Sequence, residues 1–498
     1  MWKYIRFFVI LALAGVGVYG LLWHSGAFLP GWVIWENRAV SDSSAEYEIL
    51  LERKTVDILY QGNPVWTSPK DIKVQDALSC DIDNDGMDEL LLLCWKRGRY
   101  GEHKPFWVEK DEKSWSQHLF VYEYAAGEIR PKWMSSYIGQ DVTEMSCREG
   151  APPGVHLLFI SPDGVLSSWF WDSWGFTKEK TETTFVVFGD NLIHEPIYRY
   201  GLQEIESTGE TGNAGKMRNG GETAAVVAGF DFLYENIRDV IEESDIAVIN
   251  QETPFVEDPS LYGDYPQFGT PVQVGEAIVN AGFDVVTCAT NHALDRGKEG
   301  VNTTRNFFAD NKVMCLGIQS EEDTAYHPYE ILVRNGVRFA LFNYTYGTNG
   351  IRIPEENPNM VHVLDDENKI TNDIEMARAE SDFVIVFVHW GTEYAETPDE
   401  FQRKWTQIFA DGKVDVVVGT HPHAIQPYEL LRDEEGHEML VYYSIGNYIS
   451  AQPEESCVKG GMASFTVSLT AEGFRVTEYG FRPLIIRWEE GGKYVTSF

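Results

Sequence analysis

Residues 415–423 read DVVVGTHPH, one of six stretches of the same form: a short apolar run that ends in a side chain able to bind a metal or move a proton. Continuous β-branched and aromatic runs of this length are typical of strands buried on both faces, in sheets covered by helices. In such folds the ligand site lies outside the carboxyl ends of the strands. We therefore expect the polar ends to gather at one edge of one sheet as a metal site. The six runs are 184–190 (TFVVFGD), 245–252 (DIAVINQE), 284–292 (DVVTCATNH), 382–389 (DFVIVFVH), 415–423 (DVVVGTHPH) and 440–447 (LVYYSIGN).

The composition is that of a folded and strongly acidic protein. Hydrophobic residues make up 43% of the 498 residues, and by length the chain should hold ~3 compact units. Acidic residues outnumber basic ones by 77 to 40, which gives a formal charge of -37 at pH 7. Because such a body repels nucleic acid, we expect no nucleic-acid partner.

The six cysteines are too sparse for a disulfide framework and contain no C-x-x-C pair. Cys288 and Cys315 stand in apolar runs, which predicts buried thiols. Cys80 and Cys94 bracket one loop and could pair in an exported protein.

The first residues predict a membrane segment. Lys3 and Arg6 precede an uncharged run over residues 7–23. This run is longer than the ~7–15 residues of a secretory h-region and lacks a small-residue cleavage site, and residues 25–29 can extend it. We predict an uncleaved signal anchor at residues 1–29, with a single pass of the cell membrane and the bulk of the chain extracellular. A cleaved signal peptide is the alternative.

Residues 30–180 predict an all-β domain, because short aromatic-rich runs alternate with turns. One loop within it carries oxygen donors at positions 1, 3, 5 and 9 and a glycine, Gly86, at position 6, which suits a calcium ion. The loop is similar to the calcium loops of FG-GAP/VCBS repeats, although only one such copy is present. A plain Asp/Gly-rich turn is the alternative. The expected calcium ligands are Asp81, Asp83, Asp85 and Glu89.

Residues 181–498 predict an α/β sandwich with a flexible insert at about 201–228, where Gly, Ser, Thr and Asn are dense. Beyond the insert, helices and strands alternate. We expect helices over 232–244 and 272–281, and another that begins with Thr397 as its N-cap and stops at Gly412. The tail, 462–468 and 474–479, predicts antiparallel strands at a sheet edge.

The polar ends of the runs form a candidate metal site. Carboxylate, amide and imidazole donors together suit Mn, Zn or Fe, and more than four candidates favour two ions. His292, next to a candidate ligand, is placed to donate a proton, and Asp295 to orient it. The metal candidates are Asp190, Glu252, Asn291, His389, His421 and His423; the expected substrate contacts are His194, Glu393, Tyr394 and Asn447.

Six ordered motifs make the chain resemble the CapA family of poly-γ-glutamate capsule-synthesis proteins, which are similar to calcineurin-like metallophosphoesterases. The motifs are GD (189–190), NQE (250–252), NHALDRG (291–297), HWGTEY (389–394), GTHPH (419–423) and SIGNY (444–448). The resemblance implies a sandwich of metallophosphoesterase type, the six metal ligands named above and His292 as the catalytic acid. The chain departs from the usual D-x-H motif, because Leu192 stands two residues after Asp190.

The resemblance implies a metal-dependent hydrolase that acts in capsule synthesis or on another cell-envelope polymer. Its expected partner is an anionic cell-surface polymer such as poly-γ-glutamate. The alternative is a non-catalytic subunit that binds or exports polymer together with the other subunits of an anchored capsule synthase. A calcium-dependent adhesion module would leave the six motifs unexplained.

Overall fold

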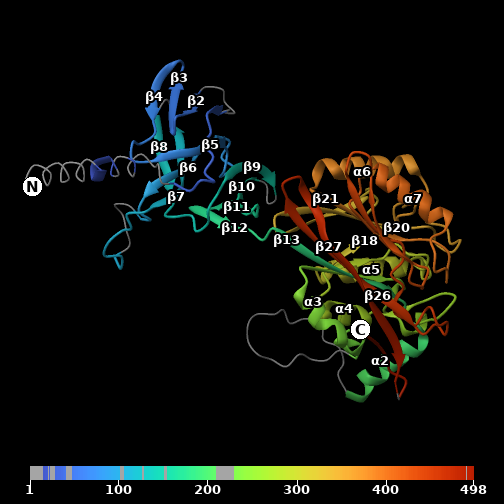
Figure 1. Ribbon diagram of the computed structural model, residues 1–498. Helices are drawn as coiled ribbons and strands as arrows, with labels where there is room; N and C mark the ends of the chain where they lie inside the picture. The colour runs from blue at the N-terminus through green and yellow to red at the C-terminus, as the bar shows by residue number, and fades with distance from the viewer. Residues whose placement is uncertain are drawn as a thin grey trace, which may run out of the picture. The chain divides into compact units, whose positions relative to one another are not determined.

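The computed structural model describes residues 15–18, 20, 22, 29–40, 47–100, 106–125, 128–150, 154–208, 229–489 and 491–498. It divides into two compact units, Met1–Thr181 and Glu182–Phe498 (Figure 1). The predicted anchor at residues 1–29 falls almost entirely outside the described residues. Among those that are described, no helix is both long enough and apolar enough to cross a membrane.

The described part of the first unit is built from three four-stranded antiparallel sheets, in the orders β1-β2-β3-β4, β5-β6-β7-β8 and β12-β11-β10-β9. Alternate side chains of a strand face opposite sides. Leu90 and Leu92 therefore pack against the first of these sheets, and Leu91 and Leu93 against the third. The β5–β8 sheet is thus the central layer. The strands are β1 (Arg38–Val40), β2 (Tyr47–Glu52), β3 (Thr55–Tyr60), β4 (Asn63–Thr67), β5 (Lys73–Cys80), β6 (Glu89–Arg97), β7 (Trp115–Ala125), β8 (Glu128–Met134), β9 (Glu144–Gly150), β10 (Gly154–Ile160), β11 (Leu166–Asp172) and β12 (Gly175–Lys178).

The second unit contains two large sheets, so the expectation of one sheet was wrong. The first sheet has the order β18-β17-β14-β13-β26-β27-β28, with β25 also paired to β13, and the second has the order β19-β20-β21-β22-β24-β23. The first comprises β18 (Met314–Leu316), β17 (Val285–Thr287), β14 (Ile246–Gln251), β13 (Glu182–Asn191), β25 (Asn447–Ile449), β26 (Lys459–Thr470), β27 (Gly473–Trp488) and β28 (Tyr494–Ser497). The second comprises β19 (Tyr329–Arg334), β20 (Val337–Thr345), β21 (Phe383–His389), β22 (Val416–Thr420), β24 (Glu438–Tyr442) and β23 (Tyr428–Arg432).

The two sheets face each other across a shared apolar core. Phe185 and Val187 of β13 belong to the same cluster as Phe339 of β20 and Ile385 of β21. The other faces of the two sheets are covered by helices, which explains why the runs are apolar at every position. The resulting four layers, helix, sheet, sheet and helix, confirm the predicted α/β sandwich (Figure 1).

Each sheet has its own set of helices. Helices α3 (Arg238–Glu243), α4 (Gln273–Ala281) and α5 (Gly297–Asp310) cover the first sheet, and Ile278 and Phe308 pack with Phe188 there. Helices α6 (Glu367–Glu380) and α7 (Glu400–Asp411) cover the second, and Ile374 and Trp405 pack with Val386.

Three local predictions need correction. The predicted 232–244 helix is two 3₁₀ turns, Asp231–Leu233 and Glu235–Ile237, followed by the short α3. The N-cap of α7 is Asp399 rather than Thr397, because Asp399 forms a reciprocal capping box with Gln402. Helix α2 (Glu195–Thr208) extends into the predicted flexible insert. The local sequence of α2 favours a helix only weakly, and burial of Ile197 in the core stabilises it. Residues 209–228 lie outside the described part.

Candidate metal centre

The six predicted metal ligands come together at the carboxyl ends of strands from both sheets. Asp190 lies in β13, Glu252 follows β14, and Asn291 follows β17. On the second sheet His389 ends β21, and His421 and His423 lie in the loop after β22. None exposes more than 3% of its surface. Polar side chains buried this deeply are costly unless they find partners.

Hydrogen bonds link these side chains across the two sheets. Asp190 Oδ2 accepts from the backbone N–H of His421 at 3.1 Å and lies 3.1 Å from His423 Nδ1. His389 Nε2 lies 2.9 Å from Asn291 Oδ1. The carboxylate of Glu252 faces two imidazoles, with Oε1 at 3.6 Å from His389 Nε2 and 3.8 Å from His423 Nε2. The set is therefore one contiguous cluster.

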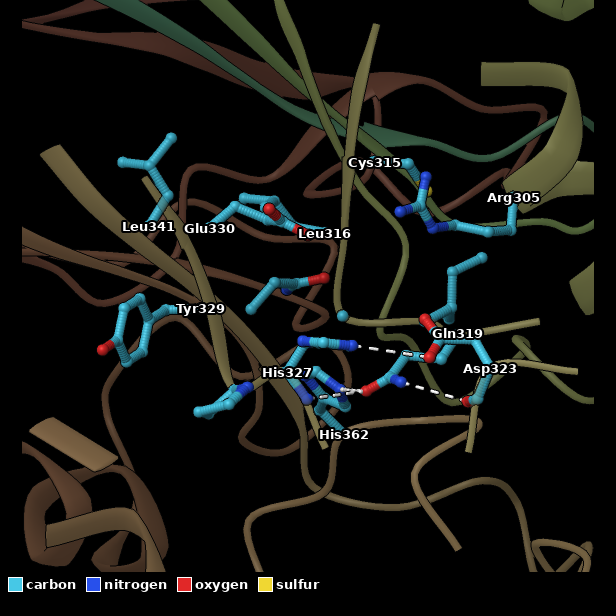
Figure 2. A pocket seen from close by; sticks show the side chains of 14 residues that line it. Arg305, Cys315, Leu316, Gln319, Asp323, His327, Tyr329, Glu330, Leu341 and His362 are labelled. Atoms are coloured by element: carbon cyan, nitrogen blue, oxygen red, sulfur yellow. Dashed lines mark hydrogen bonds and ion pairs between the residues drawn. The ribbon is translucent and has the colours of Figure 1, made fainter. Parts of the chain in front are cut away.

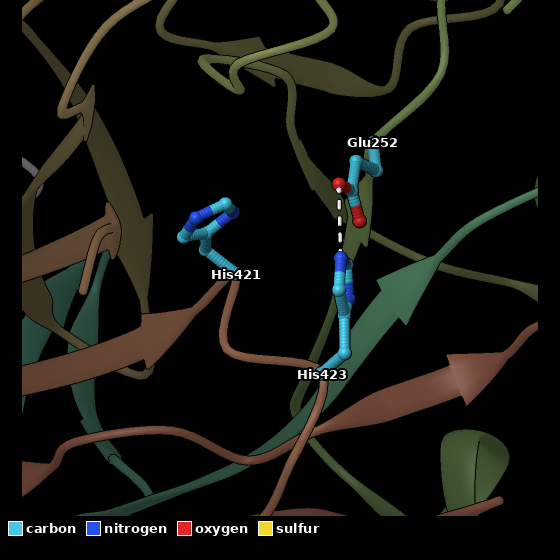
Figure 3. Close-up of side chains that lie close together, drawn as sticks. All are labelled: Glu252, His421 and His423. Atoms are coloured by element: carbon cyan, nitrogen blue, oxygen red, sulfur yellow. Dashed lines mark ion pairs between the residues drawn. The ribbon is translucent and has the colours of Figure 1, made fainter. Parts of the chain in front are cut away.

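Part of this cluster is left without hydrogen-bond partners. Both carboxylate oxygens of Glu252 and the Nδ1 atom of His421 are buried, and none has a partner among the described residues. Glu252, His421 and His423 each offer a ligand atom within 4.8 Å of the others. Figure 3 shows His423 paired with Glu252 and His421, from the same loop, to one side of them. A divalent cation fits this donor set and would satisfy the orphaned atoms.

The charges of the site depend on one another. Burial raises the pKa of Glu252 well above its usual value, against the opposing effect of His423. Burial also lowers the pKa of His389 and of His421. Burial alone would lower the pKa of His423 too, but the carboxylates of Glu252 and Asp190 outweigh it and raise the pKa to about 9. The cluster thus holds a proton on His423 at neutral pH, at a position where a cation would compete with it.

The loop that carries the two histidines has a strained backbone. His421 has φ 95 and His423 φ 56, both in the left-handed region that side-chain-bearing residues seldom adopt. Such conformations cost on the order of 1–3 kcal/mol each and collect at functional sites. Gly419 just before them is required, since a Cβ there would lie 2.1 Å from the carbonyl oxygen of Tyr443. Both imidazoles of this loop lie within 4.8 Å of the same carboxylate, that of Glu252.

His292 is paired with Asp295 beside the cluster. Its Nδ1 lies 2.7 Å from Asp295 Oδ2, which also accepts the backbone N–H of Phe268 at 2.8 Å. The ring of Phe268 packs edge-on against His292, at 4.8 Å between centroids. With Nδ1 held by the carboxylate, Nε2 is the nitrogen that can exchange a proton with a ligand.

The four predicted substrate contacts lie in different surroundings. His194 Nδ1 pairs with Asp264 Oδ1 at 2.7 Å, while its buried Nε2 has no partner among the described residues. Asn447 is fully buried behind the site, with Oδ1 2.9 Å from His423 Nδ1. Glu393 and Tyr394 are exposed, and the Tyr394 ring lies 6.3 Å from that of His423.

Sequence reasoning missed several neighbours of the cluster. Asn250 donates to Asp190 Oδ1 at 2.7 Å, and Thr420 Oγ1 lies 3.0 Å from His389 Nδ1. The Tyr346 ring lies 4.6 Å from that of His421. Asn349 lies within hydrogen-bonding range of both Asn291 and His292. Asn250 and Thr420 stand inside the quoted motifs and could have been found there, whereas Tyr346 and Asn349 come from a loop without a pattern.

A pocket away from this cluster lies beside β18, β19 and β20 (Figure 2). Its described lining contains none of the six predicted ligands. Asn343 lies there, and its Oδ1 accepts from the backbone N–H groups of Cys288 and Ala289, while its Nδ2 donates to the carbonyl of Phe387. Asn343 thus ties the two sheets together.

The predicted calcium loop is only partly assembled. Asp81, Asp83 and Asp85 each place a carboxylate oxygen within 4.8 Å of the others. Glu89 does not join this group, because it is buried and its carboxylate accepts from the backbone N–H of Ile82 and from Lys132. The ammonium of Lys132 also lies 2.5 Å from Asp83. A lysine thus pairs with two of the four predicted ligands and offsets part of their charge.

Comparisons with known proteins point to one family. The model of the bacterial capsule synthesis protein PGA_cap matches residues 184–452. The PGA biosynthesis protein CapA of Bacillus subtilis (strain 168) is 25% identical over 231 residues, 45% of this chain and 58% of that protein. The capsule biosynthesis protein CapA of Bacillus anthracis is 26% identical over 232 residues, 45% of this chain and 55% of that protein. The chain thus spans a little over half the length of the curated relatives it matches.

Among solved structures, the calcineurin-like phosphoesterase YfkN from Bacillus subtilis is 14% identical, with a TM-score of 0.31. The match covers 61% of this chain and 90% of that chain. A likeness this distant supports no conclusion about fold or function.

Proposed function

The chain belongs to the family of the bacterial capsule synthesis protein PGA_cap, and we propose that its second unit is a divalent-metal-dependent hydrolase. Its substrate would be an anionic capsule polymer such as poly-γ-glutamate, or another polymer of the cell envelope. The observation that carries the proposal is the pair of orphaned oxygens of Glu252, buried between His421 and His423. Buried carboxylate oxygens without hydrogen-bond donors are destabilising unless a cation completes their coordination.

Each residue has a role that follows from its place. Asp190, Glu252, Asn291, His389, His421 and His423 would hold the cation. When bound, the cation supplies a polarised water and neutralises charge on the substrate. His292 would hold a proton at Nε2 and transfer it to the leaving group, while Asp295 fixes the ring through Nδ1 and stabilises the imidazolium before the transfer. Tyr394 and Glu393, exposed beside the cluster, would contact the polymer.

The basic test is to purify the protein, determine its bound metals by mass spectrometry, and assay it with phosphodiester and γ-glutamyl substrates. We expect near-stoichiometric Mn, Zn or Fe, and turnover of one substrate class that is lost on chelation and restored by the metal. Protein that stays metal-free after incubation with each of these ions would contradict the proposal.

Asp295→Asn is expected to lower turnover by roughly 10²–10³-fold while the metal content stays unchanged. The amide keeps the shape of the carboxylate but does not stabilise the imidazolium of His292. Metal content and kcat are measured on the same preparation. The control is Asp323→Asn, which removes the acidic partner of the exposed His327 in the same unit. Equal turnover in Asp295→Asn and the wild type would show that Asp295 does not assist proton transfer by His292.

A non-catalytic polymer-binding subunit is the second candidate, and one observation favours it. Leu192, buried and apolar, stands two residues after Asp190, and the nearby His194 has one nitrogen engaged by Asp264. A second ion would therefore lack an imidazole ligand on this strand. Metal-loaded protein that binds poly-γ-glutamate but cleaves neither substrate class would support this candidate.

We also propose that the 81–89 loop binds Ca²⁺ weakly, with a Kd on the order of 10⁻⁴–10⁻³ M. Because Lys132 competes for Asp83 and Glu89, Lys132→Met is expected to tighten Ca²⁺ binding roughly 10-fold by raising the uncompensated negative charge of the loop. Calorimetric titration measures this affinity. Arg130→Met on the same strand removes one positive charge without touching the loop and serves as the control. No Ca²⁺ binding in either variant would show that the loop is a plain turn.

A further inference from the structure

Two cysteines of the first unit meet where its central sheet packs on a neighbouring sheet. Cys80 ends β5 in the central sheet, and Cys147 lies in β9 of the other. Cys80 and Met145 belong to one buried cluster, and Cys147 is on the same face of β9 as Met145 because alternate residues share a face. A hydrogen bond between the two thiols raises the pKa of Cys80 and lowers that of Cys147. The two side chains therefore bridge the two sheets.

The structure rules out the disulfide between Cys80 and Cys94 that the sequence left open. Cys80 faces Glu89 across the β5–β6 ladder, whereas Cys94 faces Val74, at the other end of the same strand. A bond between Cys80 and Cys94 would have to span most of the length of β5. A disulfide bridges Cα atoms no more than about 7 Å apart, so this pair is excluded.

Buried side-chain hydrogen bonds fix the approach of the two sheets. Gln75 of β5 donates through Nε2 to the carbonyl oxygens of Val142 and Thr143, both at 3.0 Å. Gln117 of β7 donates to the Val142 oxygen at 2.7 Å and accepts the Val142 N–H at 2.7 Å. These bonds clamp the segment that leads into β9 onto the central sheet. These bonds hold β9, the strand of Cys147, close to β5, the strand of Cys80.

The surroundings of the two sulfurs make this pair reactive. Cys147 is exposed, and the hydrogen bond from Cys80 lowers its pKa, which favours the thiolate that attacks disulfides. Cys80 is buried, and its pKa is raised by the same bond and by burial, so it keeps its proton until Cys147 is consumed. One accessible thiolate beside one protonated thiol is the arrangement of an attacking and a resolving cysteine.

A second pair of neighbouring cysteines allows a comparison. Cys288 and Cys315 lie 3.6 Å apart, but both are buried, and burial raises the pKa of Cys288. Cys315 lines the pocket of Figure 2 yet is only 3% exposed. Proximity alone would make both pairs equivalent. Exposure and thiolate character distinguish them, and both favour the first pair.

We propose that Cys80 and Cys147 form a disulfide that staples the two sheets of the first unit when the chain meets a low-molecular-weight disulfide oxidant. The Cys147 thiolate attacks one sulfur of the oxidant, which forms a mixed disulfide and releases one thiolate. That thiolate takes the proton of Cys80, whose sulfur then displaces the second oxidant thiolate from Cys147. Two protein thiols lose two electrons in total, and the oxidant disulfide becomes two thiols.

The test uses the full chain, reduced and then incubated with oxidised glutathione. Free thiols are alkylated after denaturation, and peptides are mapped by mass spectrometry without reduction. We expect the peptides of Cys80 and Cys147 to be linked in most molecules, with Cys94, Cys288, Cys315 and Cys457 alkylated. Since the bond closes a long segment of chain, the thermal midpoint of the unit should rise by roughly 5 °C or more and fall again on reduction.

Two single variants test whether the thermal shift comes from the Cys80–Cys147 link. Cys147→Ser should abolish the link and the shift in thermal midpoint, and Cys315→Ser should change neither. Two results would overturn the proposal: glutathione left on Cys147 with no link to Cys80, which means the sulfurs cannot reach bonding geometry, or a Cys288–Cys315 link formed in preference. Neither the link nor the thermal shift depends on activity of the second unit.

Discussion

The double variant His421→Ala/His423→Ala is expected to retain less than roughly a tenth of the divalent metal bound by the wild type, and to lose turnover with it. Three ligand atoms lie within 4.8 Å of one another, one from Glu252 and one from each of these two imidazoles. Removing both takes away two of the six proposed ligands and leaves His389 as the remaining imidazole beside Glu252, so the metal should no longer survive gel filtration. Metal content is measured by mass spectrometry after incubation with Mn²⁺ and gel filtration.

The strained backbone calls for a second variant, because alanine at φ 95 and φ 56 could disturb the loop by itself. His421→Asn/His423→Asn removes both imidazoles but keeps residues that tolerate the left-handed region. We expect it to fold like the wild type by circular dichroism and to lose metal as the alanine pair does. His327→Ala/His437→Ala, two histidines of the same unit away from the site, should keep full metal content. Retention of metal by the asparagine pair would mean that the cation is held elsewhere.

The sequence predicted the candidate ligands because their types and positions obey a simple rule. A buried run ending in Asp, Glu or His places that group at the carboxyl edge of a sheet, and the two histidines around Pro422 cannot lie far apart. This rule could not predict the number of sheets. A strand that packs on a second sheet with one face and on helices with the other has the same apolar pattern in either sheet. The residues of the 346–350 loop were missed for a related reason: Tyr346 and Asn349 reach the site through tertiary packing, without a local signal.

The same limit explains the corrections elsewhere. The Asp81–Asp85 spacing indicated a cation loop, but Lys132, 49 residues from Asp83 in sequence, changes its charge balance and could not be placed from the sequence. Thr397 and Asp399 are both good N-caps, and Gln402 decides between them through the capping box. Local patterns predict elements, whereas charge partners across the fold require coordinates.

The affinity for Mn²⁺ is expected to rise with pH, by roughly 100-fold between pH 7 and pH 9. His423 has a pKa of about 9, raised by the carboxylates of Glu252 and Asp190, so in the metal-free protein this imidazole holds a proton that a cation must displace. Calorimetric titration in two buffers with different heats of protonation gives the affinity and the number of protons released. We expect about one proton per ion near pH 7.5. An affinity that is constant over this range would contradict the assignment of His423 as a ligand.

The stability of the metal-free protein should fall as pH rises, whereas its affinity for Mn²⁺ rises. The pKa of His423 is raised in the folded state, so the stabilisation from its proton is present at low pH and is lost as pH rises between about 6.5 and about 9. The increase in thermal midpoint caused by Mn²⁺ should therefore grow with pH. Glu252→Gln removes a carboxylate that holds the proton on His423, and burial then lowers the pKa of that imidazole. In this variant Mn²⁺ should bind more weakly and with a flatter dependence on pH, because fewer protons remain to be displaced. An equally steep dependence in Glu252→Gln would assign the released proton to another group.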